Sequence, residues 1–369
     1  MKYYIIAGEA SGDLHGSNLI KQIRQLDPKA NIRCWGGEMM RSAGATLVKD
    51  YKELAFMGFI EVIMNLRTIL KNIKFCKQDV QAFKPDVLIL IDYPGFNIRI
   101  AEWAKKEEIK TIYYISPQIW AWKESRVHTI KKSVDKMLVI LPFEKDFYRK
   151  WEYKVEYVGH PLVEVIEEFK STHKEPSKEE KKIVALLPGS RKQEINKKLP
   201  VMLEVSKAFP GYQFVVAKAP GQEDDFYEPF LAPYKNVSAI AGKTYELLNQ
   251  ATAALVTSGT ATLEAALFEV PQVVCYKGNS ISYEIAKSVI KVKYISLVNL
   301  IMDRPVVKEL IQHKMTAENC IKELKDLLQN PAKKRQVQDD YRVLIHLLSQ
   351  GGPASSNAAK IIFDFIKAA

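Results

Sequence analysis

The sequence predicts an α/β protein of two doubly wound domains, each built on a parallel sheet that is covered by helices. Short apolar runs rich in Ile, Val and Tyr recur along the 369 residues, and each is followed by a polar turn and a helical pattern. Strands that are apolar on both faces and alternate with helices are typical of parallel sheets. A charged stretch divides the runs into two series, and the length also favours two domains over one.

The apolar runs give the predicted strands of both sheets. In the first series these are residues 3–7, 32–35, 87–91, 111–115, 137–141 and 155–158. In the second series they are residues 183–187, 213–217, 253–256 and 272–276. Two such series predict Rossmann-like domains that face each other across a cleft, with ligands bound just beyond the carboxyl ends of the strands.

Residues 169–182 (FKSTHKEPSKEEKK) form the most charged and least apolar window of the chain. This composition predicts an interdomain linker, and the alternative is a surface loop within one large sheet. We therefore expect one domain over residues 1–170 and a second over 171–349. The tail is helical in pattern, and its last segment, 350–369, can join the first domain.

The composition indicates a globular protein, because 47% of the residues are hydrophobic and 26% are charged. No apolar stretch reaches the roughly 18 residues that a membrane span needs. The opening apolar run is too short for a signal peptide, so a cytoplasmic protein is expected. The four cysteines are far apart and lack metal-ligand spacing, which predicts free buried thiols.

The formal net charge of +11 favours an anionic partner such as nucleic acid, a phosphorylated substrate or an acidic membrane surface. A nucleic-acid-binding protein predicts a concentrated basic face and strongly salt-dependent affinity. The basic residues here are dispersed and no reader motif is present. Nucleic acid is therefore not the expected partner.

The first predicted strand is followed by the turn GEASGDLHG at residues 8–16. Glycines let backbone N–H groups approach a ligand, and the positive end of the next helix favours anions. Ser11, Gly12 and Asp13 are therefore candidate site residues. The GxGxxG spacing of a dinucleotide site is absent, and the alternative is a tight turn in which Ser11 or Asp13 caps the helix.

Asp92 stands at the carboxyl end of the strand predicted at residues 87–91, in the motif IDYPGFN. A carboxylate at this position can accept a proton from an attacking hydroxyl, so Asp92 is the candidate general base. The alternative for a lone carboxylate is helix capping. His160, in the motif VGHPL, is a second candidate base, with hydrogen bonding within its turn as the alternative.

Another predicted strand leads into SPQIWAW at residues 116–122. A proline and two tryptophans make a rigid loop whose flat faces suit sugar rings or acyl chains. The alternative is that both aromatic rings pack in the core beneath the loop.

In the second series the motif LLPGSR places Ser190 and Arg191 at a helix start. A guanidinium matches phosphate oxygens with two hydrogen bonds and keeps its charge, so Arg191 is a candidate phosphate ligand. The alternative is a surface ion pair.

The motif TSGTATLE at residues 257–264 also follows a strand, and it predicts a diphosphate site on Ser258, Gly259 and Thr260. Glu264, one helical turn deeper, can hold the two hydroxyls of a ribose. The alternative for this turn is a simple helix cap. Three further polar residues stand beside apolar runs: Asn299, Glu309 and Gln312. Taken singly, each is expected to have a structural role.

A helix is predicted to continue from about residue 56 to about residue 83, with dense apolar positions alongside Arg67, Lys71, Lys74 and Lys77. Such a helix can dip into an anionic membrane or contact acyl chains. The alternative is an interior helix of the first domain. The candidate membrane or acyl contacts are Phe59, Ile63, Leu66, Ile69 and Leu70.

Taken together, these motifs resemble the lipid-A-disaccharide synthase family. The matching stretches are GEASGDLHG, MGFIEV (57–62), IDYPGFN, YISPQIWAW (114–122), LPFEKDFY (141–148), VGHPL, LLPGSR, TSGTATLE and KELIQ (308–312). They occur in order over nearly the whole chain and thin out after about residue 330. One departure is Val298, where the family commonly has Pro before Asn299.

The resemblance implies a glycosyltransferase B-type fold, an inverting transfer without metal or cofactor, and a place in lipid A biosynthesis at the cytoplasmic face of a Gram-negative inner membrane. It implies UDP-2,3-diacylglucosamine as donor and 2,3-diacylglucosamine 1-phosphate as acceptor, giving a β-1,6-linked disaccharide 1-phosphate and UDP. A homodimer is compatible with it.

In this reading the second domain binds the UDP-sugar and the first domain is the acceptor and membrane side. Asp92 acts as base, with the turn around Asp13 closing on the reacting centre. Arg191 neutralises charge on the leaving UDP, and Asn299 and Gln312 line the donor pocket. Ser190 and Glu309 are further candidate substrate-binding residues. The rival enzyme is a UDP-sugar epimerase of the same fold, which needs no lipid acceptor.

Overall fold

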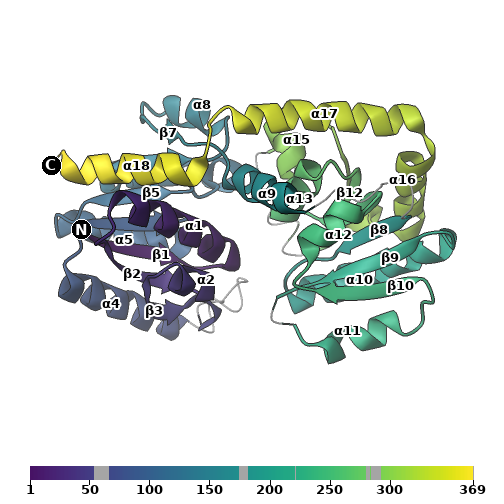
Figure 1. The fold of residues 1–369 in the computed structure, drawn as a ribbon, viewed down its shortest axis with the longest axis horizontal. Coiled ribbons are helices and arrows are strands. Elements are labelled where there is room, and N and C mark those ends of the chain that lie inside the picture. The colour runs from purple at the N-terminus through teal and green to yellow at the C-terminus, as the bar shows by residue number, and fades with distance from the viewer. Residues whose placement is uncertain (54–65, 174–181, 221, 280–282, 284–291, 369) are drawn as a thin grey trace. The chain divides into compact units, whose positions relative to one another are not determined.

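The computed structural model describes residues 1–53, 66–173, 182–220, 222–279, 283 and 292–368. The chain forms two compact units (Figure 1). The first unit comprises Met1–Pro161 together with Ser349–Ala369, and the second comprises Leu162–Leu348.

The first unit is built on a seven-stranded sheet with the order β3-β2-β1-β4-β5-β6-β7, and every pair of neighbouring strands is parallel. Its strands are β1 (Lys2–Ala7), β2 (Asn31–Gly36), β3 (Thr46–Asp50), β4 (Val87–Ile91), β5 (Thr111–Tyr114), β6 (Lys136–Val139) and β7 (Glu156–Tyr157).

The second unit is built on a six-stranded sheet with the order β10-β9-β8-β11-β12-β13, and its neighbouring strands are likewise parallel. Its strands are β8 (Ile183–Leu187), β9 (Gln213–Lys218), β10 (Val237–Ala241), β11 (Ala253–Thr257), β12 (Gln272–Tyr276) and β13 (Lys308–Ile311). Both sheets reverse their strand order once, which confirms the predicted doubly wound class.

Helices connect the strands of each unit (Figure 1). In the first unit they are α1 (Ala10–Leu26), α2 (Glu38–Ser42), η1 (Tyr51–Glu53), α4 (Leu66–Phe83), α5 (Pro94–Lys106), α6 (Ile119–Trp122), α7 (Arg126–Ser133), α8 (Glu144–Arg149) and α18 (Ala354–Lys367). Helix α9 (Pro161–Thr172) begins at the boundary and continues in the second unit. The others there are α10 (Lys192–Val205), η2 (Ser206–Ala208), α11 (Asp224–Leu231), α12 (Thr244–Gln250), α13 (Thr260–Leu267), α15 (Leu297–Met302), η3 (Gln312–Lys314), α16 (Ala317–Gln329) and α17 (Pro331–Ser349).

All the strands predicted from apolar runs are present, with ends that shift by a residue or two. Strands β3, β10 and β13 were not predicted. All three lie at the edge of a sheet, and their residues are mostly half-buried or exposed. An edge strand has one paired side and a partly solvated face, so it needs no continuous apolar run.

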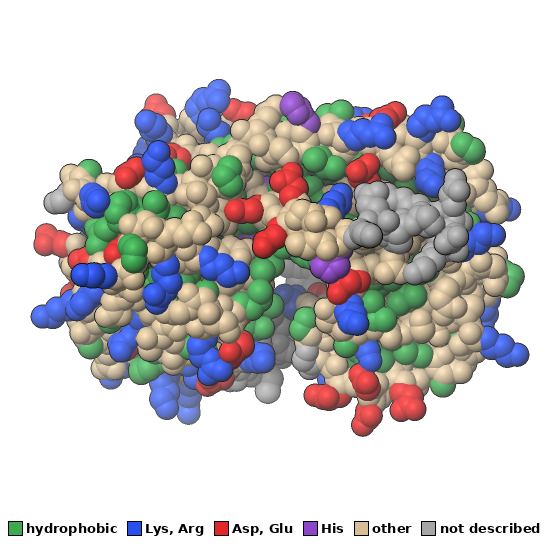
Figure 2. Space-filling model, viewed as in Figure 1, with side chains coloured by type: hydrophobic (Ala, Val, Ile, Leu, Met, Phe, Trp, Pro, Cys, Tyr) green, Lys and Arg blue, Asp and Glu red, His purple; other side chains and the backbone are tan. Residues whose placement is uncertain are grey.

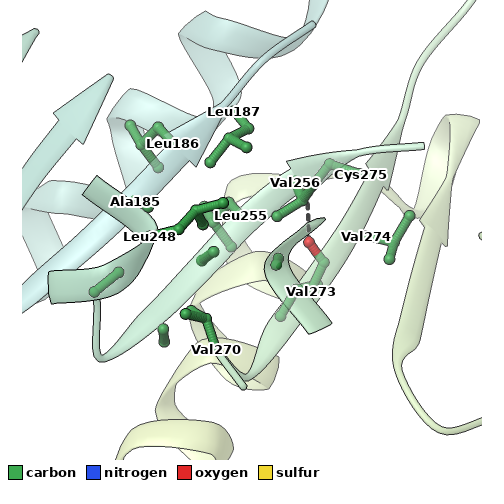
Figure 3. Close-up of a cluster of buried hydrophobic side chains, with 14 of the residues drawn as sticks. Ala185, Leu186, Leu187, Leu248, Leu255, Val256, Val270, Val273, Val274 and Cys275 are labelled. Atoms are coloured by element: carbon green, nitrogen blue, oxygen red, sulfur yellow. Dashed lines mark hydrogen bonds between the residues drawn. The ribbon is translucent and has the colours of Figure 1, made fainter. Parts of the chain in front are cut away.

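The core of each unit forms around its central strands. In the second unit, Leu186, Leu255 and Val274 come from three adjacent strands and are each fully buried (Figure 3). Leu248 of α12 packs into the same cluster. Burial of these runs stabilises the central strands in the sheet, because burying one large aliphatic side chain contributes about 1.5–3 kcal/mol to the free energy of folding.

The chain returns to the first unit after α17, and its last helix, α18, packs along α1 (Figure 1). The return depends on Gly159, whose φ is +95°. A Cβ on Gly159 would lie 2.4 Å from the carbonyl oxygen of Gly352. The amide of Asn357 donates hydrogen bonds to the carbonyls of Val158 (3.2 Å) and Gly351 (2.7 Å). The VGHPL motif therefore holds the returning chain.

The expected boundary after residue 170 falls within α9, and the contacts assign that helix to the second unit from Leu162 onward. Most of the predicted linker, residues 174–181, lies outside the described residues. The four cysteines are free and buried, as predicted. None of the helices described is long and apolar enough to cross a membrane.

Candidate functional site

In each unit, two of the predicted motif turns leave neighbouring central strands. Ala7 pairs with Ile91 in the first sheet, so the turns after β1 and β4 start side by side. Val256 pairs with Leu187 in the second sheet, so the turns after β8 and β11 do the same. These are the points where the strand order reverses, and doubly wound sheets bind their ligands there.

Asp92 follows β4 in an unusual backbone conformation. Both Asp92 (φ 43°) and Tyr93 (φ 50°) are left-handed, which costs of order 1–3 kcal/mol per non-glycine residue and clusters at functional sites. The backbone carbonyl of Asp92 accepts hydrogen bonds from the Tyr113 hydroxyl (2.5 Å) and the Asn97 amide (2.8 Å). These buried donors fix the strained turn.

The environment of Asp92 also changes its acidity. Desolvation, together with the nearby negative charge of Glu9, raises the pKa of the Asp92 carboxyl to about 7. A general base is most effective when its pKa lies near the working pH. The structure therefore gives Asp92 the acidity that the predicted role needs.

Ser11, Gly12 and Asp13 lie in the first turn of α1, where no side chain caps the helix. Ser11 is half-buried, and Gly12 packs against Ala7. The Asp13 carboxylate is 3% exposed and accepts hydrogen bonds from backbone N–H groups at Gly37 (2.8 Å), Met39 (3.2 Å) and Met40 (3.0 Å). Its described contacts are structural: they hold the start of α2 against α1.

Glycine is required at position 8 because the two turns of the first unit touch. A Cβ on Gly8 would lie 2.4 Å from ring carbons of Tyr93. The Tyr93 ring in turn stacks on Phe96, with 5.5 Å between the ring centroids. The turn after β1 thus supports the residue that follows Asp92.

The two tryptophans of residues 116–122 have different roles. Trp120 is buried, and its indole N–H donates to the Glu144 carboxylate (3.2 Å), so here the structural alternative holds. Trp122 is 43% exposed, and the Arg126 guanidinium lies 4.7 Å from its ring centroid. Only Trp122 offers a flat face to a ligand. Burial raises the pKa of Glu144 to about 7.

His160 is buried in the turn that holds the returning chain. Desolvation and the neighbouring His15 lower its pKa to about 3. An imidazole with so low a pKa is a weak proton acceptor at neutral pH, so the geometry favours Asp92 over His160 as the base.

In the second unit, Ser190 and Arg191 end the turn between β8 and α10. Ser190 is exposed, and the Arg191 side chain is 52% exposed. Arg191 pairs with Glu194 at 3.3 Å across one turn of helix. The ion pair named as the alternative is therefore present, but the guanidinium stays accessible to solvent and can reach an anion.

The turn between β11 and α13 presents a helix start without a side-chain cap. Gly259 and Thr260 are exposed, and a Cβ on Gly259 would meet nothing within 4 Å. The Ser258 hydroxyl donates to the carbonyl of Ile295 (2.7 Å), which anchors the turn. The backbone N–H groups of this helix start suit a phosphate group.

Glu264 lies one turn deeper in α13 and is half-buried. The hydroxyl of Tyr245 donates to its carboxylate at 3.2 Å, and burial raises the Glu264 pKa. Tyr245 belongs to an aromatic cluster with Phe169 and Phe268, at centroid distances of 5.6 and 5.4 Å. The carboxylate is thus held in place while remaining partly open.

Asn299 and Glu309 form one hydrogen-bonded unit. The Asn299 amide donates to the Glu309 carboxylate (2.9 Å), and Asn299 also exchanges two hydrogen bonds with the backbone of Val307. Glu309 further accepts from the backbone and hydroxyl of Ser296 (2.9 and 2.8 Å). These contacts fix the loop whose residue Ile295 accepts the Ser258 hydroxyl. Both side chains therefore hold in place the loop that anchors the turn at residues 258–260.

Gln312 has a left-handed backbone (φ 53°), and its side-chain oxygen accepts from the N–H of Gly278 (3.2 Å). Its side-chain nitrogen is buried and lacks a hydrogen-bond partner among the residues that the structure describes. A buried amide in this state is a candidate ligand contact.

Helix α4 has one buried and one solvent-facing side. Ile73, Cys76 and Val80 are buried. On the other side Leu70 is 52% and Phe75 is 44% exposed, while Ile69 is half-buried. The exposed basic residues of this helix are Arg67, Lys71 and Lys74. Phe59 and Ile63 lie outside the described residues, and of Leu66 only the backbone is described.

Sequence reasoning missed several residues that organise these turns: Tyr113, Glu144, Lys198 and Tyr245. Glu144 lies within LPFEKDFY, but nothing local indicates that it would bind Trp120. Over the described part of the chain, no group of three or more His, Cys, Asp and Glu side chains is placed to hold a metal ion. Figure 2 shows Lys and Arg side chains scattered over the visible face.

The fold is shared with a solved epimerase and a solved glycotransferase. The UDP-GlcNAc 2-epimerase of Neisseria meningitidis bound to UDP-GlcNAc aligns with a TM-score of 0.65 over 100% of both chains, at 14% identity. The glycotransferase of kitacinnamycin aligns with a TM-score of 0.66 over 98% of both chains, also at 14% identity. This chain therefore has the glycosyltransferase B-type fold, which transferases and epimerases share.

Sequence relatives give the family. The family model described as lipid-A-disaccharide synthetase matches residues 3–363. Lipid-A-disaccharide synthase from Geobacter metallireducens is 38% identical over 374 residues, covering 98% of this chain and 96% of the relative. Lipid-A-disaccharide synthase 1 from Legionella pneumophila (strain Lens) is 38% identical over 376 residues, covering 99% and 96%. The chain belongs to the lipid-A-disaccharide synthetase family, and the epimerase alternative is not favoured.

Proposed function

We propose that this protein transfers 2,3-diacylglucosamine from UDP to the 6-hydroxyl of 2,3-diacylglucosamine 1-phosphate, giving the β-1,6-linked disaccharide 1-phosphate and UDP. The observation that carries this proposal is the match over nearly the whole chain to relatives that are named for this synthesis. The candidate site residues are consistent with such a transfer.

In the first unit, Asp92 is the general base. The acceptor hydroxyl gives its proton to the Asp92 carboxylate while its oxygen forms the new bond to the anomeric carbon of the donor. The bond from that carbon to the UDP oxygen breaks in the same step, and UDP leaves with the electron pair. A single displacement inverts the anomeric centre and needs one base and no covalent adduct. The pKa of about 7 suits Asp92 to this work.

In the second unit, the start of α13 and Arg191 bind the donor diphosphate. The helix start carries partial positive charge and unsatisfied N–H groups, and Arg191 adds a full charge that remains at every working pH. Together they stabilise the negative charge that develops on the departing UDP. Glu264 binds the ribose hydroxyls, and Gln312 contacts the donor with its side-chain amide. This binding of charge by the protein itself makes the transfer independent of metal.

Helix α4 places the acylated substrates at a membrane surface. Leu70 and Phe75 are exposed apolar side chains beside Lys71 and Lys74. Exposed apolar side chains interspersed with cations are found on helices that contact the interface of an anionic membrane. In this proposal the protein works at the cytoplasmic face of the inner membrane.

The test is to incubate the purified protein with both acylated substrates in detergent, with EDTA present, and to follow the products by mass spectrometry. The expected result is disaccharide 1-phosphate and UDP in equal amounts. Activity that appears only when Mg²⁺ is added would keep the transfer but overturn its metal independence. A folded protein that gives neither product under either condition would overturn the proposed function.

A further inference from the structure

The second unit contains a buried lysine that the roles above do not use. The Lys198 side chain, on α10, is 3% exposed. Its ammonium donates a hydrogen bond to the Thr257 hydroxyl and lies 3.5 Å from the Glu194 carboxylate. Among the residues that the structure describes, these are its polar partners. Removing an ammonium group from water costs several kcal/mol. A lysine buried at this position is therefore expected to have a specific role.

Lys198 connects the two turns of the second unit. Thr257 is the last residue of β11 and directly precedes the turn at residues 258–260. Glu194, the other partner, also binds Arg191 at 3.3 Å. The contacts therefore run from Arg191 through Glu194 and Lys198 to Thr257. They join the turn after β8 to the turn after β11.

The backbone beneath this connection is adapted to it. Gly189 has a φ of +114°. A Cβ there would lie 2.6 Å from a carboxylate oxygen of Glu194 and 3.4 Å from the Lys198 ammonium. Any larger residue would displace the Glu194 carboxylate from its place between the two cations. The glycine of the PGSR turn thus makes room for the Glu194–Lys198 pair.

The charges of this group do not cancel. Arg191 and Lys198 bring two positive charges, and Glu194 returns one negative charge. The surplus lies at the strand ends, where the uncapped start of α13 adds further positive potential. An anion that enters here completes the charge balance.

We infer that Lys198 is a positioning residue of the donor site. By binding Thr257 and Glu194 together, it holds the Arg191 guanidinium at the same edge as the helix start of residues 258–260. A nucleoside diphosphate then meets both anion-binding groups in one geometry. The inference rests on the proposed function, because it assumes that this edge binds the diphosphate of the donor.

Three variants test it. Lys198→Met keeps the length of the side chain and removes its charge, Thr257→Val removes the hydroxyl, and Lys197→Met changes an exposed neighbour as the control. UDP affinity is measured by calorimetry and donor kinetics by product formation. We expect Lys198→Met to raise the Kd for UDP and the donor KM about tenfold, because a hydrogen bond to a charged group is lost. Thr257→Val has a smaller effect of about threefold, and Lys197→Met has none.

The melting temperature separates positioning from general damage. A misplaced Arg191 binds the diphosphate less well and also stabilises the departing UDP less well, so the donor KM rises and kcat falls while the melting temperature stays near that of the wild type. A disrupted unit lowers the melting temperature as well. If Lys198→Met does not fold, the same UDP affinity and donor kinetics are measured in Thr257→Val and Glu194→Gln. Unchanged UDP affinity in the folded variants would overturn the role of Lys198 while leaving the proposed function intact. A folded wild-type protein that does not bind UDP would contradict the proposed function and remove the inference with it.

Discussion

The hydroxyl of Tyr113 lies 2.5 Å from the backbone carbonyl of Asp92 and donates a hydrogen bond to it. This bond joins the end of β4 to β5 and helps to hold Asp92 and Tyr93 in left-handed conformations. Tyr113 is fully buried, so its hydroxyl serves the turn rather than solvent. The position of the candidate base therefore depends on a residue that does not itself contact substrate in our mechanism.

Tyr113→Phe should lower kcat about tenfold, because a small displacement of a base is costly in rate. The matched control is Tyr153→Phe, which removes a hydroxyl that donates to the carbonyl of Val134 at 3.2 Å in the same unit. Both variants should lower the melting temperature by a similar amount. Equal kcat in the two variants would show that Tyr113 is no more than a structural residue.

The acidity of Asp92 predicts the pH dependence of the reaction. The carboxyl acts as base only when ionised, so kcat/KM should rise with pH through about 7. Removing the nearby negative charge with Glu9→Gln should lower the Asp92 pKa and move this rise to lower pH. Glu102→Gln changes an exposed carboxylate of the same unit and should leave the profile in place. A profile that does not move with Glu9→Gln would contradict the contribution of that charge.

Asp92→Asn should abolish most turnover and at the same time stabilise the protein at neutral pH. The folded-state pKa is raised above the ordinary value of 3.8, so the folded protein binds the proton more tightly than the unfolded chain. Wild-type stability therefore falls as pH rises from about 4 to about 7, and the Asn variant lacks this contribution. Melting temperatures at pH 4 and pH 8 measure it, and a difference between the two proteins that does not grow with pH would contradict the raised pKa.

Arg191→Ala should lower kcat about a hundredfold while the melting temperature stays near that of the wild type, because the partly exposed pair with Glu194 adds little stability. Arg342→Ala breaks a comparable exposed pair with Asp339 (2.9 Å) in the same unit and should leave kcat unchanged. If Arg191→Ala lowers the melting temperature but keeps the wild-type kcat, then Arg191 serves only as the ion-pair partner of Glu194.

Glu309→Gln should destabilise the second unit, because the carboxylate accepts hydrogen bonds from Ser296, Asn299 and the backbone of Ile295. We expect a loss of about 2 kcal/mol, the magnitude typical of a broken charged network. Thermal unfolding measures the loss, with Glu167→Gln at an exposed helical position as the control. Wild-type stability in Glu309→Gln would contradict the supporting role of the carboxylate.

Leu70→Ser combined with Phe75→Ser should reduce sedimentation with anionic vesicles, because both side chains are exposed on α4. The control is Val343→Ser, which removes an exposed apolar side chain from α17. The Phe75 ring lies 6.0 Å from that of the buried Trp35, so thermal unfolding of the double variant is measured alongside to show that the fold is kept. Unchanged vesicle binding would remove this side of α4 from the proposed membrane contact.

The sequence by itself determined the fold class and the places of the principal turns. Central strands of a parallel sheet are buried on both faces, so their apolar runs can be recognised one at a time, as those of β4 and β8 were. The strand-end motifs of Asp92, Arg191 and Gly259 were found for the same reason, because each follows such a run directly.

Only the tertiary structure decided which of these residues act on one another. The carboxylate of Asp13 binds the start of α2, Glu309 binds Asn299, and Lys198 binds Thr257 across 59 positions of sequence. The formation of the edge strands β3, β10 and β13 also depends on pairing with a neighbouring strand rather than on their own composition. Such contacts depend on strand order and register, which bring distant segments together, and no local periodicity records them.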